Sequence, residues 1–294
     1  MAATPNSAPT YVIPEQSKTA KRLQLLERFA THLVLLIFAI IVVYPVVWMA
    51  MASVKSQGDL LDNIWGLPSA FRWSNYSEAW KAASLGRALF NSIFVSLSTV
   101  ALVIAIAAPC GYALAKFKLR YGTLILLVFV LTMQAPVPII PLYVLLVKLH
   151  LTNSYIGYIL PLTAGGLPLA VFVFRAFFTT IPRDLEDAAV VDGSTQLGAF
   201  LRIVMPISVP AVATVAILQF LASWNEYFLA LILIRSPELR TLPLAIQVFF
   251  SDWGRTDWGP IFAALSVGSV PMILLYIVMQ RRFVQGLTAG AVKG

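Results

Sequence analysis

Carboxylates gathered in one polar segment are the residues of this sequence best suited to chemistry. Asp184, Glu186 and Asp187 lie close together, and Asp192 follows. The chain has two histidines, and neither is near a candidate nucleophile with a carboxylate to orient it. It also lacks a P-loop for nucleotide phosphates and a His-Glu-x-x-His zinc pattern. We therefore expect no catalytic residue, no metal site and no cofactor in this chain, and we interpret the carboxylates as contact groups for a basic partner.

The segment that contains them, residues 179–206, is predicted to form two short helices joined by a turn. Thr179 or Thr180 can cap the first helix, with Pro182 in its first turn. The acidic residues follow in that turn, where the helix dipole favours them. Two alanines after them keep the helix narrow.

Gly193 is predicted to end that helix, because glycine readily adopts the positive φ found just past a helix C-terminus. Ser194 or Thr195 can cap the second helix. The apolar residues of that helix recur at three- and four-residue spacing, and they are Leu197, Phe200, Leu201 and Val204. Pro206 stands at the junction with the next apolar stretch. The pattern predicts a narrow acidic helix–turn–helix, and the alternative is a solvated amphipathic loop.

Polar residues inside the apolar stretches form a second set, suited to hydrogen bonds with the hydroxyl groups of a solute. Ser92, Ser96 and Thr99 share one helical face, with Asn91 beside them. They could equally join neighbouring helices, and we favour that interpretation.

Glu226 is the only acidic residue within an apolar stretch, which makes it, with the adjacent Asn225, a candidate for a polar path or a gate. Alternatively, Glu226 simply reaches outer water, with Trp224 and Tyr227 as interfacial anchors. Gln134 begins a run that two prolines interrupt. An unwound backbone there would either line a path or form a packing kink.

Composition predicts the elements that must position these residues. The chain is 59% hydrophobic and 12% charged, whereas a soluble domain is about 25% charged. Six stretches are long enough to cross about 30 Å of hydrocarbon as helices, and their continuous apolar character argues against barrel strands. These stretches are residues 29–54, 88–115, 121–147, 149–174, 203–234 and 258–280. We therefore predict an all-α fold, a polytopic membrane helical bundle with six transmembrane helices.

The distribution of basic residues predicts the orientation. Six spans place both termini on one side, and the segments of that side carry 13 of the 21 basic residues, against 8 on the other. Both termini are therefore predicted to be cytoplasmic. The predicted organisation is an N-terminal tail (residues 1–28), a transmembrane domain (residues 29–282) and a C-terminal tail (residues 283–294). The scattered positive charge fits contact with membrane lipid and not with nucleic acid.

Two of the predicted outer segments, residues 52–87 and 235–257, carry clustered aromatic side chains. They form either an interfacial aromatic belt or a docking surface for an extracytoplasmic partner. The candidate docking residues are Trp65, Trp73, Tyr76, Phe249 and Trp253.

The helix–turn–helix segment resembles the EAA loop of type I ATP-binding-cassette (ABC) importer permeases. That motif reads Glu-Ala-Ala, three residues, Gly, nine residues, then Ile-x-Leu-Pro. At those spacings this chain has Asp187-Ala188-Ala189, Gly193 and Ile203-Val204-Met205-Pro206. Asp187 stands where the motif has Glu, and Met205 stands where it has Leu. Whether Asp187 or the preceding Glu186 makes the main partner contact is therefore left open.

Three further stretches resemble the MalG-like permeases of the carbohydrate branch, and they are residues 111–116, 224–227 and 280–294. The resemblance implies a permease subunit that imports a mono- or oligosaccharide by alternating access through a prokaryotic cell inner membrane. It implies as partners a second MalG- or MalF-like permease, two copies of an ABC ATPase subunit that bind ATP and Mg, and an extracytoplasmic solute-binding protein.

The resemblance also implies which residues couple transport to the ATPase. Residues 179–206 would be the coupling loop that docks into an ATPase subunit, and the C-terminal tail would make a second contact. The implied coupling residues are Glu186, Asp187, Ala188, Ala189, Asp192, Gly193, Phe200 and Pro206.

An ion-gradient-driven secondary transporter is the main alternative. It would need membrane-embedded carboxylates as ion sites, and only Glu226 qualifies. It would also leave residues 179–206 without a function. A membrane enzyme would need a cluster of catalytic groups near one face, and the sequence contains none.

Overall fold

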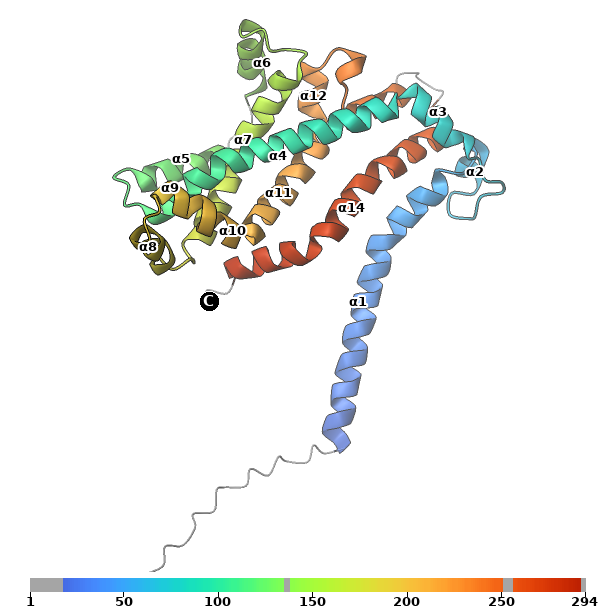
Figure 1. Ribbon diagram of the computed structural model, residues 1–294. Helices are drawn as coiled ribbons and strands as arrows, with labels where there is room; N and C mark the ends of the chain where they lie inside the picture. The colour runs from blue at the N-terminus through green and yellow to red at the C-terminus, as the bar shows by residue number, and fades with distance from the viewer. Residues whose placement is uncertain (1–17, 135–137, 251–255, 292–294) are drawn as a thin grey trace, which may run out of the picture. The chain divides into compact units, whose positions relative to one another are not determined.

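The computed structural model describes residues 18–134, 138–250 and 256–291 (Figure 1). The chain divides into two compact units, Met1–Met51 and Ala52–Gly294. All regular elements in the described ranges are helices, so the all-α prediction is confirmed for that part of the chain. Trp253 and most of the predicted N-terminal tail lie outside the described residues.

Helix α1 runs from Lys18 to Ala52 and is the element described in the first unit, with its last residue, Ala52, assigned to the second. Its Leu26–Ala52 portion is long and apolar enough to cross a membrane. The helix begins eleven residues before the predicted span because the basic stretch ahead of residue 29 continues the helix without a breaker.

The second unit contains all the other elements. In chain order they are α2 (Gln57–Asp62), α3 (Ser74–Ala82), α4 (Leu85–Lys116), α5 (Gly122–Gln134), α6 (Ile139–Lys148), α7 (Tyr155–Phe178), α8 (Asp184–Val191), α9 (Gln196–Ala199), the π-helical turn η1 (Phe200–Val204), α10 (Met205–Ile207), α11 (Val209–Trp224), α12 (Phe228–Leu233), the 3-10 turn η2 (Pro237–Leu239), α13 (Leu242–Ile246), the 3-10 turn η3 (Gln247–Phe250) and α14 (Trp258–Ala291).

Four helices in the described ranges are long and apolar enough to span a membrane: α1, α4, α7 and α14. A fifth span is present if the bent pair that includes α11 crosses as one. The predicted span 121–147 is divided into α5 and α6, two shorter apolar helices separated at the proline-interrupted run. Residues 135–137 and the side chain of Gln134 lie outside the described residues. The six-span count therefore stays a prediction.

The prediction of one continuous span over residues 203–234 is wrong. The chain bends by 74° between α10 and α11, where Pro206 and Pro210 lack the N–H groups that a straight helix requires. A second break separates α11 from α12 at Asn225–Tyr227. There the Glu226 carboxylate accepts the N–H groups of Leu229 at 2.8 Å and Ala230 at 3.1 Å, so a new helix starts.

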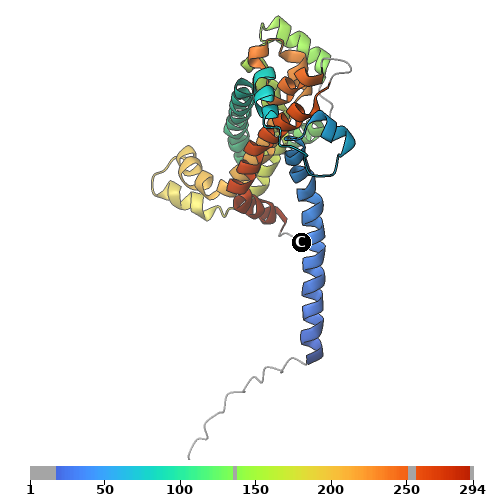
Figure 2. The ribbon, with the colours of Figure 1, turned by 90° about the vertical axis from the view of Figure 1, so that its right-hand side faces the viewer.

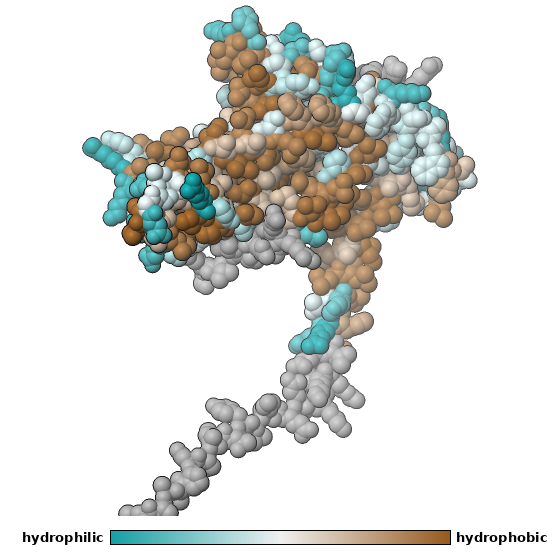
Figure 3. Space-filling model, viewed as in Figure 1, coloured by the Kyte–Doolittle hydropathy of each residue, from teal (hydrophilic) through white to brown (hydrophobic). Residues whose placement is uncertain are grey.

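The core of the second unit is built on α4, which packs most extensively against α7 and next against α11. Helix α14 covers α11 and α3 (Figure 1). Trp224 is buried and stacks on Phe220 with ring centroids 5.5 Å apart. The alternative that made Trp224 an interfacial anchor is therefore wrong, because its ring fills the core between these helices. Hydrophobic residues cover the middle of α4, and hydrophilic residues gather near α8 and near α2–α3 (Figure 3).

Helices α4 and α7 approach each other closely at Gly111. A Cβ atom at this position would lie 2.8 Å from the Phe174 Cβ and 3.0 Å from the Arg175 backbone nitrogen. Glycine therefore lets the two backbones meet, as small residues do in membrane helix pairs. The contact holds the last two turns of α4 against the end of α7, next to the 179–206 segment.

Gly111→Ala is expected to lower the stability of the second unit by about 1–3 kcal/mol, because overpacking forces the two backbones apart. Gly165→Ala is the matched control, since a Cβ atom there would meet nothing within 4 Å. Thermal unfolding of the purified protein in detergent measures both. An equal midpoint for the two variants would contradict this account of the α4–α7 contact.

Candidate functional site

The carboxylate-bearing helix α8 starts later than its capping pattern predicts. Thr179 and Thr180 donate their hydroxyl protons back to the carbonyls of Ala176 and Phe177, each at 2.7 Å. They therefore close the end of α7, and the prediction that one of them caps α8 is wrong. Helix α8 starts at Asp184, with no side-chain cap, and its first turn holds the three predicted acidic residues.

The turn after α8 is built as predicted around Gly193, whose φ is +86°. The Gly193 N–H donates to the Val190 carbonyl at 3.0 Å, and the Ser194 N–H donates to the Ala189 carbonyl at 2.9 Å. These two bonds are those of a Schellman motif. The Thr195 hydroxyl then accepts the Gly198 N–H at 3.1 Å and caps α9, which confirms one of the two predicted caps.

Glu186 points inward from α8 and is held by two side chains of α4. The Lys116 ammonium lies 2.6 Å from Glu186 Oε1, and the Tyr112 hydroxyl donates to Glu186 Oε2 at 2.5 Å. The Lys116 and Glu186 side chains are only 7% and 13% exposed. Lys116 also donates to the Ile181 carbonyl at 2.7 Å. These charge-assisted contacts are stronger than neutral hydrogen bonds and fix α8 to the end of α4.

Arg183 adds a second tie between the same two elements. Its guanidinium donates to the Lys116 carbonyl, one of the last backbone acceptors of α4, at 2.7 Å. A cavity of about 230 Å³ lies beside these contacts. Its lining residues are Tyr112, Lys116, Phe117, Arg183, Glu186, Asp187, Val190, Gln196 and Ala199.

An aromatic cluster buries the base of the segment. The Phe200 ring lies 4.7 Å from the Tyr112 ring and 6.2 Å from the Phe178 ring, between centroids. Phe200 is 5% exposed, so it anchors the segment to α4 and α7 and presents no surface to a partner.

The eight predicted coupling residues thus separate into three groups by their exposure. Glu186 and Phe200 face the body of the unit, and Ala189 is half-buried. The remaining residues are exposed, and they are Asp187, Ala188, Asp192, Gly193 and Pro206. Sequence reasoning missed the supporting residues Tyr112, Lys116 and Arg183, although all three lie in stretches that carried the resemblance.

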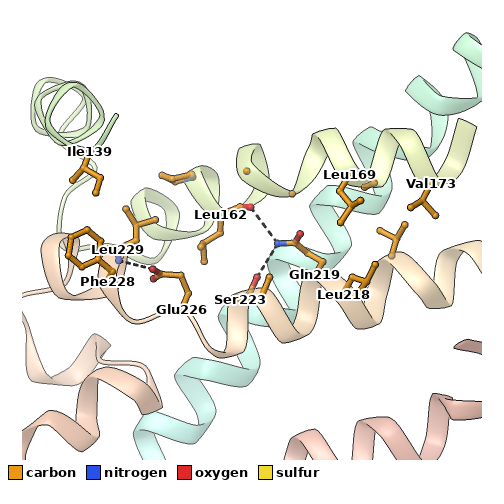
Figure 4. A pocket seen from close by; sticks show the side chains of 16 residues that line it. Ile139, Leu162, Leu169, Val173, Leu218, Gln219, Ser223, Glu226, Phe228 and Leu229 are labelled. Atoms are coloured by element: carbon orange, nitrogen blue, oxygen red, sulfur yellow. Dashed lines mark hydrogen bonds between the residues drawn. The ribbon is translucent and has the colours of Figure 1, made fainter. Parts of the chain in front are cut away.

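A separate pocket of about 350 Å³ lies between α7 and α11 (Figure 4). Its walls are mostly apolar, with three polar side chains, Gln219, Ser223 and Glu226, on α11 and just beyond its end. The other lining residues are Ile139, Pro161, Leu162, Gly165, Gly166, Leu169, Ala170, Val173, Val215, Leu218, Ala222, Phe228 and Leu229.

Both carboxylate oxygens of Glu226 are occupied by groups of this chain. The Tyr158 hydroxyl donates to Oε2 at 2.9 Å, and the backbone N–H groups at the start of α12 donate to both oxygens. Glu226 therefore supports the break between α11 and α12 and forms one end of the pocket.

The other predicted path residues lie elsewhere. Asn91 donates to the Glu238 and Arg240 carbonyls, and Ser92 accepts the Leu242 N–H at 2.8 Å, so both join α4 to the segment around η2. Ser96 and Thr99 are buried on the same face of α4, and Asn225 is exposed and donates to the Leu221 carbonyl of α11. None of these residues lines the pocket.

Gln219 and Ser223 are the pocket residues that sequence reasoning missed. The available signal was their four-residue spacing, which continues to Glu226 three residues later and places one polar stripe on an otherwise apolar helix.

The candidate docking aromatics are partly available at the surface. Trp65 and Trp73 are 69% and 66% exposed. The Tyr76 hydroxyl lies 2.7 Å from the Ser53 hydroxyl, and Phe249 packs against a buried cluster. A docking role for this set stays a prediction.

Comparison with known proteins places these features in a family. Residues 107–289 match the family model described as the binding-protein-dependent transport system inner membrane component. The chain is 39% identical to the sulfoquinovosyl glycerol transport system permease protein SmoH of Agrobacterium fabrum, over 85% of this chain and 89% of that protein. It is 35% identical to the diacetylchitobiose uptake system permease protein NgcG of Streptomyces coelicolor, over 90% and 89%.

The fold is also found in a solved structure. A chain of a bacterial ABC transporter involved in the import of the acidic polysaccharide alginate superposes with a TM-score of 0.76. The match covers 92% of this chain and 99% of that chain at 22% sequence identity, so it establishes a shared architecture.

Glu186→Ala is expected to loosen α8, because it removes the carboxylate that Lys116 and Tyr112 hold. Hydrogen bonds to a charged group contribute about 1.5–3 kcal/mol, so amide hydrogen exchange in α8 should become about 10- to 150-fold faster. Asp187→Ala is the matched control, since it removes an exposed carboxylate from the same helical turn. Equal exchange in the two variants would show that Glu186 does not anchor α8.

Proposed function

The chain belongs to the binding-protein-dependent transport system inner membrane components, as a carbohydrate-branch type I ABC importer permease, and we propose that it couples sugar passage to a separate ATPase subunit through residues 179–206. It is a bacterial inner-membrane subunit of a kind that is not itself catalytic. In the proposed complex, this chain forms half of the translocation path for a mono- or oligosaccharide. The partners are a second permease, two ATPase subunits and an extracytoplasmic solute-binding protein.

The observation that carries the proposal is the construction of the coupling loop, residues 179–206. Helices α8 and α9 project to one side of the second unit (Figure 2). The exposed side of the loop carries Asp187 and Asp192, whereas the inner carboxylate of Glu186 is tied to α4. A solvated loop would need no such anchoring. A segment that is anchored to the unit and carries exposed carboxylates is suited to bind a basic cleft of an ATPase subunit and to transmit the motion of that subunit.

The same geometry supports Asp187 as the main contact to the ATPase. Glu186 has both oxygens engaged by Tyr112 and Lys116 and is 13% exposed. Withdrawing it to meet a partner would leave the nearly buried Lys116 ammonium without its carboxylate, which is costly. Asp187 is exposed on the adjacent position and can bind a basic group at no such cost.

The proposed mechanism needs only differential binding. ATP-driven closure of the two ATPase subunits would bring the coupling loops of the two permeases together and favour the outward-open state, and hydrolysis would release them. A proton- or sodium-driven mechanism has little support, because the Glu226 carboxylate is engaged by three donors of this chain.

Uptake by the reconstituted complex tests the proposal directly. Proteoliposomes that contain both permeases should accumulate sugar only when the ATPase subunit, ATP and the loaded binding protein are present. Uptake by this chain under an ion gradient, without the ATPase subunit, would overturn it.

Gly193→Val should uncouple the complex, because a β-branched residue at φ +86° is strained by about 1–3 kcal/mol and distorts the Schellman turn. We expect ATP-dependent uptake and co-purification of the ATPase subunit to fall about tenfold or more. Gly193→Asn is the matched control, since asparagine tolerates positive φ, and it should retain most activity. Both variants should remain in the membrane. Normal uptake by Gly193→Val would argue against a coupling role for residues 179–206.

A further inference from the structure

The connection between α4 and α5 carries charges that the proposed coupling role does not explain. Exposed basic and apolar side chains alternate along it, and they are Phe117, Lys118, Leu119, Arg120 and Tyr121. Within the described parts of the chain, no ion pair includes Lys118 or Arg120. We call residues 117–121 the basic loop, and it presents two positive charges that no described carboxylate neutralises.

The helices on both sides keep the basic loop at the membrane boundary. Helix α4 is long and apolar enough to cross a membrane, and α5 contains no charged residue. On α5, Leu124, Leu127 and Leu131 are more than half exposed, as in a helix that faces lipid. Because each residue of a connection extends at most about 3.6 Å, a loop this short cannot carry its charges far from the two helix ends. The basic loop therefore lies at the level of the lipid headgroups.

The side chains of the basic loop have the chemistry of an interfacial anchor. Phe117 and Tyr121 are 41% and 59% exposed. The guanidinium carbon of Arg120 lies 5.4 Å from the centre of the Tyr121 ring, which is a cation–π distance. Aromatic rings favour the headgroup region, and basic residues favour an anionic leaflet. Figure 3 shows a hydrophilic edge beside hydrophobic surface at the end of the unit where α4 and α5 join.

The charges of the neighbouring coupling loop argue against the ATPase subunit as the occupant of the basic loop. The two loops lie at the same end of the unit (Figure 1), and both line the cavity beside Glu186. The coupling loop exposes Asp187 and Asp192, so a cleft that receives it is basic and repels the basic loop. An anionic phospholipid has the opposite charge and is present at this level of the membrane.

The basic loop is also connected to the anchor of α8. The Phe117 ring packs edge-on against the Tyr112 ring with centroids 5.8 Å apart, and the Tyr112 hydroxyl donates to Glu186. The Arg183 guanidinium binds the carbonyl of Lys116, the residue immediately before the basic loop. A ligand that holds the basic loop therefore also restrains the side chains around Glu186.

We infer that the basic loop binds the headgroup of an anionic phospholipid, and that the bound lipid stabilises the anchoring of α8. Lys118 and Arg120 contact the headgroup, and the Phe117 and Tyr121 rings lie beside the glycerol and upper acyl groups. The inference rests on the proposed function in one respect: a cytoplasmic coupling loop places the bound lipid in the cytoplasmic leaflet.

Fluorescence quenching tests the lipid at the basic loop. Cys110 is the only cysteine of this chain, so Cys110→Ala/Thr123→Cys places one bimane label on an exposed residue at the start of α5. The complete complex is studied in phosphatidylcholine nanodiscs that contain a rising fraction of nitroxide-labelled phosphatidylglycerol or nitroxide-labelled phosphatidylcholine. The nitroxide is carried near the glycerol end of an acyl chain. The complex with Cys110→Ala alone supplies the background from cysteines of the other subunits.

We expect half-maximal quenching at a fraction of labelled phosphatidylglycerol about tenfold lower than that of labelled phosphatidylcholine, because each basic residue adds to the attraction for anionic lipid. Lys118→Gln/Arg120→Gln should remove this difference. Arg87→Gln/Lys148→Gln is the matched control, since it removes two exposed basic residues outside the basic loop, and it should keep the difference. Equal quenching by the two lipids beside the unaltered loop, or loss of the difference in the control, would overturn the inference.

Amide hydrogen exchange and uptake test the connection to α8. In vesicles of phosphatidylcholine alone, we expect exchange in α8 to be about fivefold faster, and ATP-dependent uptake about fivefold slower, than in vesicles that contain phosphatidylglycerol. Lys118→Gln/Arg120→Gln should lose this dependence on lipid. If the double variant kept the full dependence, the stabilising role of the bound lipid would be refuted.

The outcomes separate this inference from the proposed function. If the label detects no lipid preference while uptake still requires ATP and the ATPase subunit, only the inference fails. If uptake does not require ATP, the proposed function fails whichever lipid the label detects.

Discussion

The contact between α4 and α7 at Gly111 is the constraint on which the other features of the second unit depend. Because the backbones meet there, Tyr112 and Lys116 emerge from the last turns of α4 directly above the start of the coupling loop. The Lys116 ammonium is nearly buried, and a buried ammonium without a partner costs several kcal/mol. Glu186 supplies that partner, so the helix contact and the anchoring of α8 stabilise each other.

Hydropathy predicts the spanning helices well and their interruptions poorly. Helices α4, α7 and α14 fall where long uncharged stretches predict them, because a helix in hydrocarbon satisfies its own backbone. The breaks at residue 208 and at residues 225–227 depend on groups that hydropathy does not weigh. Prolines remove donors at the first break, and at the second the Glu226 carboxylate replaces the missing helical acceptors. Hydropathy averaged over a window of residues cannot locate either break.

The turn chemistry of the coupling loop was predictable, but the direction of its carboxylates was not. Gly193 and Thr195 act through their own backbone neighbours, so their roles follow from local sequence. Glu186 and Asp187 are adjacent and chemically alike, and α8 has no buried residue that would define its inner face. Their different roles are set by Lys116, which is seventy residues away in the sequence. Such a pairing becomes visible only after the helices have packed.

The connectivity explains how a loop at one end of the unit can act on a pocket between two helices. Helix α7 enters the coupling loop at Phe178, and α11 leaves it at Val209, and these two helices are the walls of the pocket. Phe178 and Phe200, on the two ends of the loop, both pack on the Tyr112 ring of α4. On the proposed function, a force on the exposed side of α8 would be transmitted to this packed aromatic cluster, because close-packed interiors transmit strain. Rotation of that cluster would then change the separation of α7 and α11. The loop would thus be both the contact for the ATPase and the hinge between α7 and α11.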